Sequence, residues 1–90
     1  MLFKLSIGSN NKTKKLEDKK AIKITSKHFE GFSSYKGLGY WHGKPERTLF
    51  IEIETIKDWK IIRLSRTLCE KLNQNAIMVA KIGQAQFVSA

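Results

Sequence analysis

An α+β fold is predicted by three features of this sequence. Residues 48–54 alternate apolar residues with polar or aromatic ones, and this period of two is typical of a half-buried strand. Two other segments, 12–29 and 61–72, space their apolar residues three and four apart, as amphipathic helices do. Short apolar or alternating runs add a strand before the first helix and another after the second. The resulting order predicts a ferredoxin-like βαββαβ sandwich, a four-stranded antiparallel sheet with two helices on one face.

The first strand is expected at residues 1–8 and the first helix at residues 12–29. Ser9-Asn10-Asn11 is the polar turn that joins them. Gly31 follows the helix at the usual place for a glycine beyond a helix C-terminus.

A β-hairpin stands at the centre of the chain. Its strands are expected at residues 35–42 and 48–54, and Gly43-Lys44-Pro45-Glu46 supplies the turn. In the predicted sandwich, the strands at 1–8 and 48–54 are central and direct alternate apolar residues at the helices. These residues are Phe3, Leu5, Ile7, Leu49, Ile51 and Ile53.

The pattern Thr55-x-x-Asp58 indicates the start of the second helix, because these side chains can cap its first turn. Residues 76–82 are then expected to form a short buried strand, and residues 85–89 to continue it as an edge. The apolar stripe expected on the second helix consists of Ile61, Ile62, Ser65, Leu68, Cys69 and Leu72.

Length and composition indicate one domain, residues 1–90. The chain has 90 residues, 41% of them hydrophobic, and no run approaches the roughly 18 apolar residues of a membrane span. The single cysteine, Cys69, excludes an internal disulfide framework and a multi-cysteine metal site. Because no secretory signal is evident and a lone thiol suits a reducing compartment, we expect a cytoplasmic protein that does not interact with membranes.

Sets of residues that would carry catalysis or bind a metal are not evident. The chain lacks a Gly-x-Ser-x-Gly nucleophile elbow, and Cys69 on the helix stripe is expected to be a buried packing residue. His28 and His42 lie on different predicted elements, without partners at ligand spacing. We therefore expect neither a metal nor a cofactor, and an enzyme is the less favoured class of function.

Net charge is the strongest indication of function. The chain carries +9, from 17 Lys and Arg against 8 Asp and Glu, and such a field attracts polyanions. Lysines recur every three or four residues along the predicted first helix, and Lys60, Arg63 and Arg66 form a second basic strip on the second helix. The nucleic-acid-binding residues predicted from this pattern are Lys12, Lys15, Lys19, Lys23, Lys27, Arg63 and Arg66. A stripe of like charges costs helix stability, which an anionic partner would offset.

The predicted hairpin is a second candidate site, because aromatic rings adjoin cations there. Such a combination grips single-stranded nucleic acid or a nucleotide base. The ligand-binding residues predicted here are Tyr40, Trp41, His42, Lys44 and Arg47. Glu52 and Glu54 make the open face of the sheet a poor platform for RNA, so binding is expected at the helices and the hairpin tip.

Four short runs in the second part of the chain resemble the sequence of a known protein family. They are Gly39-Tyr40-Trp41-x-Gly43, Glu46-Arg47-x-x-Leu49-Phe50-Ile51, Leu72-Asn73-Gln74-Asn75-Ala76 and Ala85-Gln86-Phe87-Val88-Ser89. Over residues 32–89 the chain resembles a small bacterial family of unknown function that has a Gly-x-Trp hairpin and ferredoxin-like order. The resemblance implies the fold and brings no activity with it.

Together these features predict a non-catalytic binding protein for a polyanion, with nucleic acid as the first choice. One alternative is an oligomeric protein that binds or sequesters a small nucleotide, as a viral inhibitor of host defence can do. Another is a protein-protein inhibitor module with an acidic protein partner. Leu2, Phe50 and one face of the strand at 35–41 lie on the open sheet face and favour a homodimer through that face. Lys4 and Glu52 are expected on the same face of neighbouring strands, where they can pair.

Overall fold

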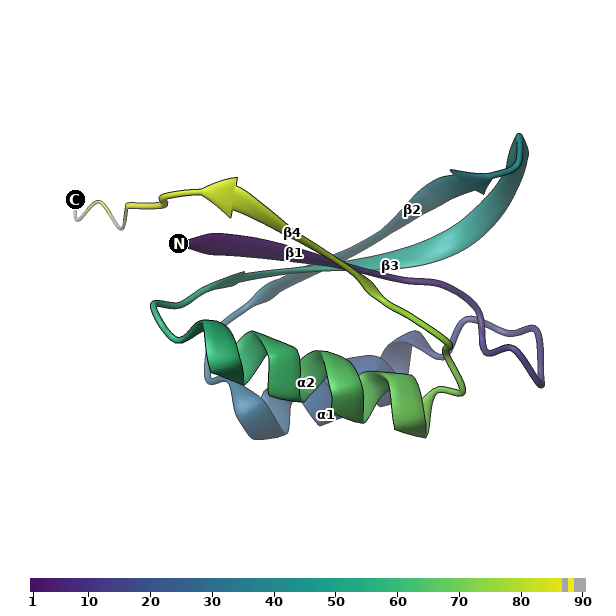
Figure 1. Ribbon diagram of the computed structural model, residues 1–90, viewed down its shortest axis with the longest axis horizontal. Coiled ribbons are helices and arrows are strands. Elements are labelled where there is room, and N and C mark those ends of the chain that lie inside the picture. The colour runs from purple at the N-terminus through teal and green to yellow at the C-terminus, as the bar shows by residue number, and fades with distance from the viewer. Residues whose placement is uncertain (87, 89–90) are drawn as a thin grey trace.

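The computed structural model describes residues 1–86 and 88. Its elements are β1 (Leu2–Ile7), α1 (Asp18–His28), β2 (Ser33–Trp41), β3 (Lys44–Glu54), α2 (Asp58–Lys71) and β4 (Met78–Gly83). The strands form one antiparallel sheet in the order β2-β3-β1-β4. Both helices lie on one face of this sheet (Figure 1). The predicted α+β, ferredoxin-like sandwich is therefore confirmed.

The core lies between the two central strands and the helices. Leu5 stands opposite Ile51 in the pairing of β1 with β3, and every second residue of both strands is buried from Phe3 to Ile7 and from Leu49 to Ile53. These are the apolar residues that the sequence predicts to face the helices. The helices contribute Ala21, Ile61, Leu64 and Leu68 to the core, and Leu72, directly after α2, completes it.

The apolar stripe of α2 differs from the expected one at three positions. Leu64 is fully buried although the predicted stripe omits it, whereas Ile62 is 47% exposed and Cys69 is half-buried. The buried residues follow an i, i+3, i+4, i+7 row, and Ile62 and Cys69 lie one residue further round the helix. Thr55 does not cap the helix; its Oγ1 accepts a hydrogen bond from the Lys57 backbone N–H (3.1 Å) in the turn before it.

Helix α1 begins at Asp18, six residues later than expected, because Asn10 organises the preceding segment as a turn. Its buried side-chain oxygen accepts hydrogen bonds from the backbone N–H groups of Lys12 (2.8 Å) and Thr13 (3.2 Å). Lys14 follows with a positive φ of 62°. Local side-chain bonds of this kind compete with helix formation. The prediction of a helix from Lys12 is therefore wrong.

The hairpin turn is tighter than expected. Trp41 pairs with Lys44, so the turn consists of His42 and Gly43 alone, with φ values of 51° and 73°. Two successive positive φ values define the type I′ turn that fits the twist of a hairpin. Pro45 consequently lies within β3, where residues 44–48 pair only with β2, and the predicted turn at 43–46 is wrong.

Strand β4 is an edge strand and is not buried. It pairs only with β1, and Met78 and Ile82 are 66% and 51% exposed. The prediction of a buried strand at 76–82 is therefore wrong: the strand begins at Met78, two residues later, and much of it is exposed. The expected continuation over 85–89 is not strand at residues 85, 86 and 88, and Phe87 and Ser89 lie outside the described residues.

Candidate nucleic-acid interface

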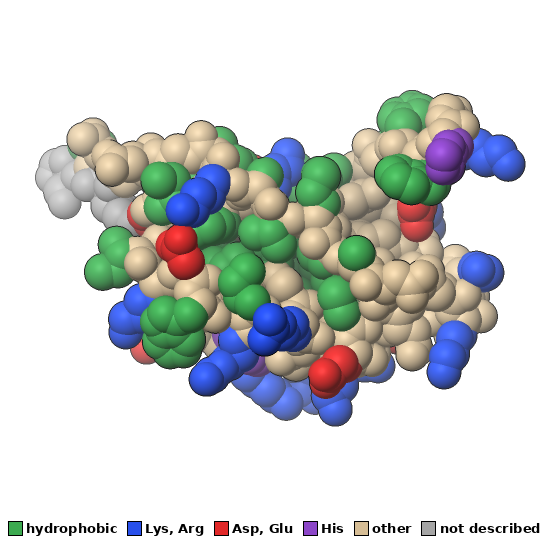
Figure 2. Space-filling model, in the orientation of Figure 1, with side chains coloured by type: hydrophobic (Ala, Val, Ile, Leu, Met, Phe, Trp, Pro, Cys, Tyr) green, Lys and Arg blue, Asp and Glu red, His purple; other side chains and the backbone are tan. Residues whose placement is uncertain are grey.

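The two helices run antiparallel and share a basic outer surface. The Lys20 ammonium donates a hydrogen bond to the Lys71 carbonyl (2.8 Å), which ties the start of α1 to the end of α2. Figure 2 shows lysine and arginine side chains gathered below the helices, on the side away from the sheet. Exposed cations on this surface include Lys19, Lys23, Lys27, Arg63 and Arg66.

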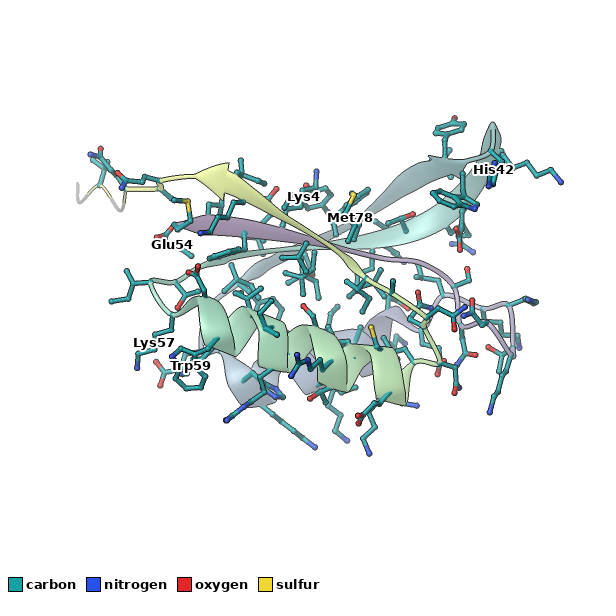
Figure 3. All side chains as sticks on the ribbon, in the orientation of Figure 1. Lys4, His42, Glu54, Lys57, Trp59 and Met78 are labelled. Carbon is teal, nitrogen blue, oxygen red and sulfur yellow. The ribbon has the colours of Figure 1, made fainter. Side chains whose placement is uncertain are left out.

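Trp59 is the aromatic centre of that surface. It lies at the second residue of α2 and is 54% exposed, and the Arg63 guanidinium carbon stands 5.1 Å from the centre of its ring. Figure 3 labels Trp59 at the helix end beside Lys57, away from the sheet. A large exposed ring held beside a cation offers both a stacking surface and positive charge.

Two hollows meet at Trp59 and Arg63. The larger one, about 430 Å³, is also lined by Ile62, Arg66, Thr67 and Glu70. The smaller one, about 190 Å³, is lined by Lys27 and His28 from the end of α1 and by Lys60 from α2. We call Lys27, His28, Trp59, Lys60, Arg63 and Arg66 the Trp59 cluster.

Sequence reasoning missed two members of the Trp59 cluster, Trp59 itself and His28. It placed Lys60 on a second basic strip with Arg63 and Arg66, but did not count Lys60 among the binding residues. The spacing of Trp59, Arg63 and Arg66 by four and three residues places them on one helical face, and this is the pattern that could have indicated the site. Spacing along one helix could not show that Lys27 and His28 of α1 lie beside Trp59, because this depends on how the end of α1 packs beside the start of α2.

The predicted lysine stripe divides into two groups. Lys19, Lys23 and Lys27 follow one exposed row of α1, as expected. Lys12 and Lys15 lie in the turn before the helix, so their placement on the same helical stripe is wrong. The Ser9 N–H in this segment donates to the Glu46 carboxylate (3.1 Å), which places the segment beside the part of β3 that pairs only with β2.

The predicted hairpin residues gather at the tip of a projecting arm. Tyr40 and Trp41 are 68% and 73% exposed, the rings of Trp41 and His42 meet edge to face, and Lys44 and Arg47 are also exposed. His42 and Trp59 lie at opposite ends of the molecule (Figure 3). The helical surface and the hairpin tip are therefore two separate regions.

We call the sheet face turned away from the helices the open sheet face. It carries both aromatic and charged side chains. The Lys4 ammonium lies 4.6 Å from the centre of the Phe50 ring, and Phe50 stacks on Tyr35 with ring centres 5.2 Å apart. The Tyr35 hydroxyl donates to the Glu52 carboxylate (2.8 Å). Lys4 and Glu52 are register partners as expected, but their charges engage these aromatic side chains.

Cys69 is poorly suited to act as a nucleophile. Burial raises the pKa of its thiol, a backbone hydrogen bond from Ile77 lowers it, and nearby Glu70 raises it again, with a net upward shift. A raised pKa leaves little thiolate at neutral pH. Among residues 1–86 and 88, no cluster of histidine, cysteine and carboxylate side chains has the composition of a metal site.

No protein-family model matches the chain, and no curated protein matches it significantly. The resemblance over residues 32–89 therefore stays a prediction. Within the part of the chain that the structure describes, no helix is long and apolar enough to cross a membrane.

Proposed function

We propose that this protein is a non-catalytic binding protein for nucleic acid and that the outer surface of its two helices is the binding surface. The observation that carries the proposal is the Trp59 cluster, in which cations from both helices surround one exposed tryptophan. The net charge of +9 supports it, because the molecule as a whole attracts polyanions.

The distribution of acidic side chains also favours the helical surface. Asp58 pairs with Lys81 of β4 (3.0 Å), and Asp18 pairs with Lys36 of β2 (3.4 Å), so both carboxylates of the first helical turns are engaged toward the sheet. Among the residues that line the two hollows, Glu70 of the larger one is the carboxylate, against the four cations Lys27, Lys60, Arg63 and Arg66, so the site keeps an excess of positive charge. Neutralisation of several phosphates releases condensed counterions, and this release supplies most of the sequence-independent affinity.

The proposal predicts steeply salt-dependent binding. Anisotropy of a labelled single strand of about 12 nucleotides should report binding near 50 mM salt. Four cations of the Trp59 cluster would give a slope of log K against log salt of about −2 to −3, at about −0.7 for each contact. A shallow slope would favour the small-nucleotide alternative. Binding to no oligonucleotide near 50 mM salt would contradict the proposal and leave an acidic protein as the partner to seek.

We further propose that the open sheet face forms a homodimer. It carries exposed apolar surface, including Met78 at 66% exposure, together with the cation Lys4 and the carboxylates Glu52 and Glu54. A twofold interface brings the same patch from both copies together, so a face with both signs of charge is self-complementary. The helical surface carries an excess of one sign and repels a second copy. Such a dimer leaves both helical surfaces free, and we place it in the cytoplasm, where nucleic acid is available.

The dimer is expected in light scattering at about 100 μM protein, as twice the monomer mass. Met78→Lys should shift the equilibrium to monomer, because it adds a like charge to each half of the interface. Leu38→Lys is the matched control, since Leu38 is 58% exposed on β2 outside this face. A monomeric wild type at this concentration would disprove the assembly without affecting the binding proposal.

A further inference from the structure

We infer that the Trp59 cluster takes one nucleotide of a single-stranded nucleic acid, with the base stacked on Trp59 in the larger hollow and its phosphate in the smaller hollow. This inference rests on the proposed function and goes beyond it, because it commits to an unpaired base and assigns the two hollows different roles.

The larger hollow has the chemistry of a base site. Its walls include the Trp59 ring and the apolar side chain of Ile62, which suit the faces of an aromatic ring. Its other lining residues are Arg63, Arg66, Thr67 and Glu70, which supply charged and polar groups. A glutamate accepts a hydrogen bond from the exocyclic amine of a base, and the same carboxylate repels a phosphate.

The smaller hollow has the chemistry of a phosphate site. It is lined by Lys27, His28, Lys60 and Arg63 around Trp59, without an acidic residue among its lining side chains. Lys60 lies over the Phe29 ring, with its ammonium 5.7 Å from the ring centre, and this contact orients the cation. Lysine and arginine are the side chains that neutralise phosphates of a bound strand.

Trp59 and Arg63 line both hollows, so a base and its phosphate can occupy the two sides together. The arrangement selects against a duplex, because paired and stacked bases offer no free face to an aromatic side chain. The exposed row of Lys19, Lys23 and Lys27 on α1 extends beyond one nucleotide, which favours a strand over a free mononucleotide.

Tryptophan fluorescence tests this inference site by site, because the chain contains only Trp41 and Trp59. Trp41→Phe leaves Trp59 as the reporter, and Trp59→Phe leaves Trp41 at the hairpin tip. A mixed-sequence single strand of about 12 nucleotides should quench the emission of Trp41→Phe. It should leave the emission of Trp59→Phe unchanged, and the matching duplex should quench neither variant.

Affinity gives the second readout. Trp59→Ala should weaken single-strand binding roughly 5- to 150-fold, the loss associated with one stacked base, while Trp41→Ala should leave it unchanged. Circular dichroism checks that each variant is folded. If Trp59→Ala binds as tightly as wild type with the same steep salt slope, the inference is overturned and the proposed function stands. If wild type binds no strand, both fail.

Discussion

Reversing the charge of Lys27 and Arg66 together is expected to lower the affinity for a single-stranded oligonucleotide by well over tenfold. Lys27 lines the smaller hollow beside Trp59 and Arg66 lines the larger one, so the two changes remove cations from both sides of the site. Each glutamate also repels the phosphates that its lysine or arginine would neutralise. The salt slope should become shallower by about 1.4, since about 0.7 is lost for each contact.

The double variant Lys12→Glu with Lys15→Glu is the matched control for Lys27→Glu with Arg66→Glu. It has the same net charge, but its changes lie in the turn before α1. All four residues are exposed, so folding should be preserved in both variants. An equal loss of affinity in the two double variants would show that net charge alone controls binding, and the assignment to the helical surface would be wrong.

Leu5→Ala is expected to destabilise the fold by about 2–5 kcal/mol, the usual cost of removing a large buried side chain. Leu5 is fully buried in β1, between its register partners Ile51 on β3 and Val79 on β4. Urea denaturation gives the free energy of unfolding. The exposed Leu38→Ala change should cost less than about 0.5 kcal/mol. A cost below about 1 kcal/mol for Leu5→Ala would show that the central strands do not form the core.

The sandwich itself could be predicted because its central strands obey simple alternation. In β1 and in residues 49–53 of β3 every second residue is apolar, and the sheet buries that side against the helices. One buried side and one open side impose the period of two directly on the sequence. The helices were recognisable for a similar reason, although their limits were not.

Particular side chains explain what the sequence did not reveal. The start of α1 depends on Asn10, whose segment is held by the Gln74 side chain; its amide donates to the Gly8 (3.2 Å) and Ser9 (2.6 Å) carbonyls. That contact joins positions 65 and 66 residues apart, so no local pattern records it. The sequence prediction misplaced the hairpin turn because the first of its two positive φ values belongs to His42, and a positive φ is expected at glycine.

The candidate site was likewise predictable where it follows the pattern of one helix and not where it depends on packing between helices. Lys19, Lys23 and Lys27 were predictable from their spacing along one helix, as were Arg63 and Arg66 along the other. That side chains from both helices meet around Trp59 could not be predicted, because it depends on how the end of α1 packs beside α2 in the sandwich.

The central claim is that the outer surface of the helices binds nucleic acid, and amide chemical-shift mapping by NMR tests it most directly. Titration of labelled protein with a single strand of about 12 nucleotides should shift the amides around Lys27, Trp59 and Arg63. The open sheet face around Lys4 and Met78 should stay unchanged. Shifts confined to the hairpin tip or to the open sheet face, with the amides of α1 and α2 unmoved, would contradict the claim.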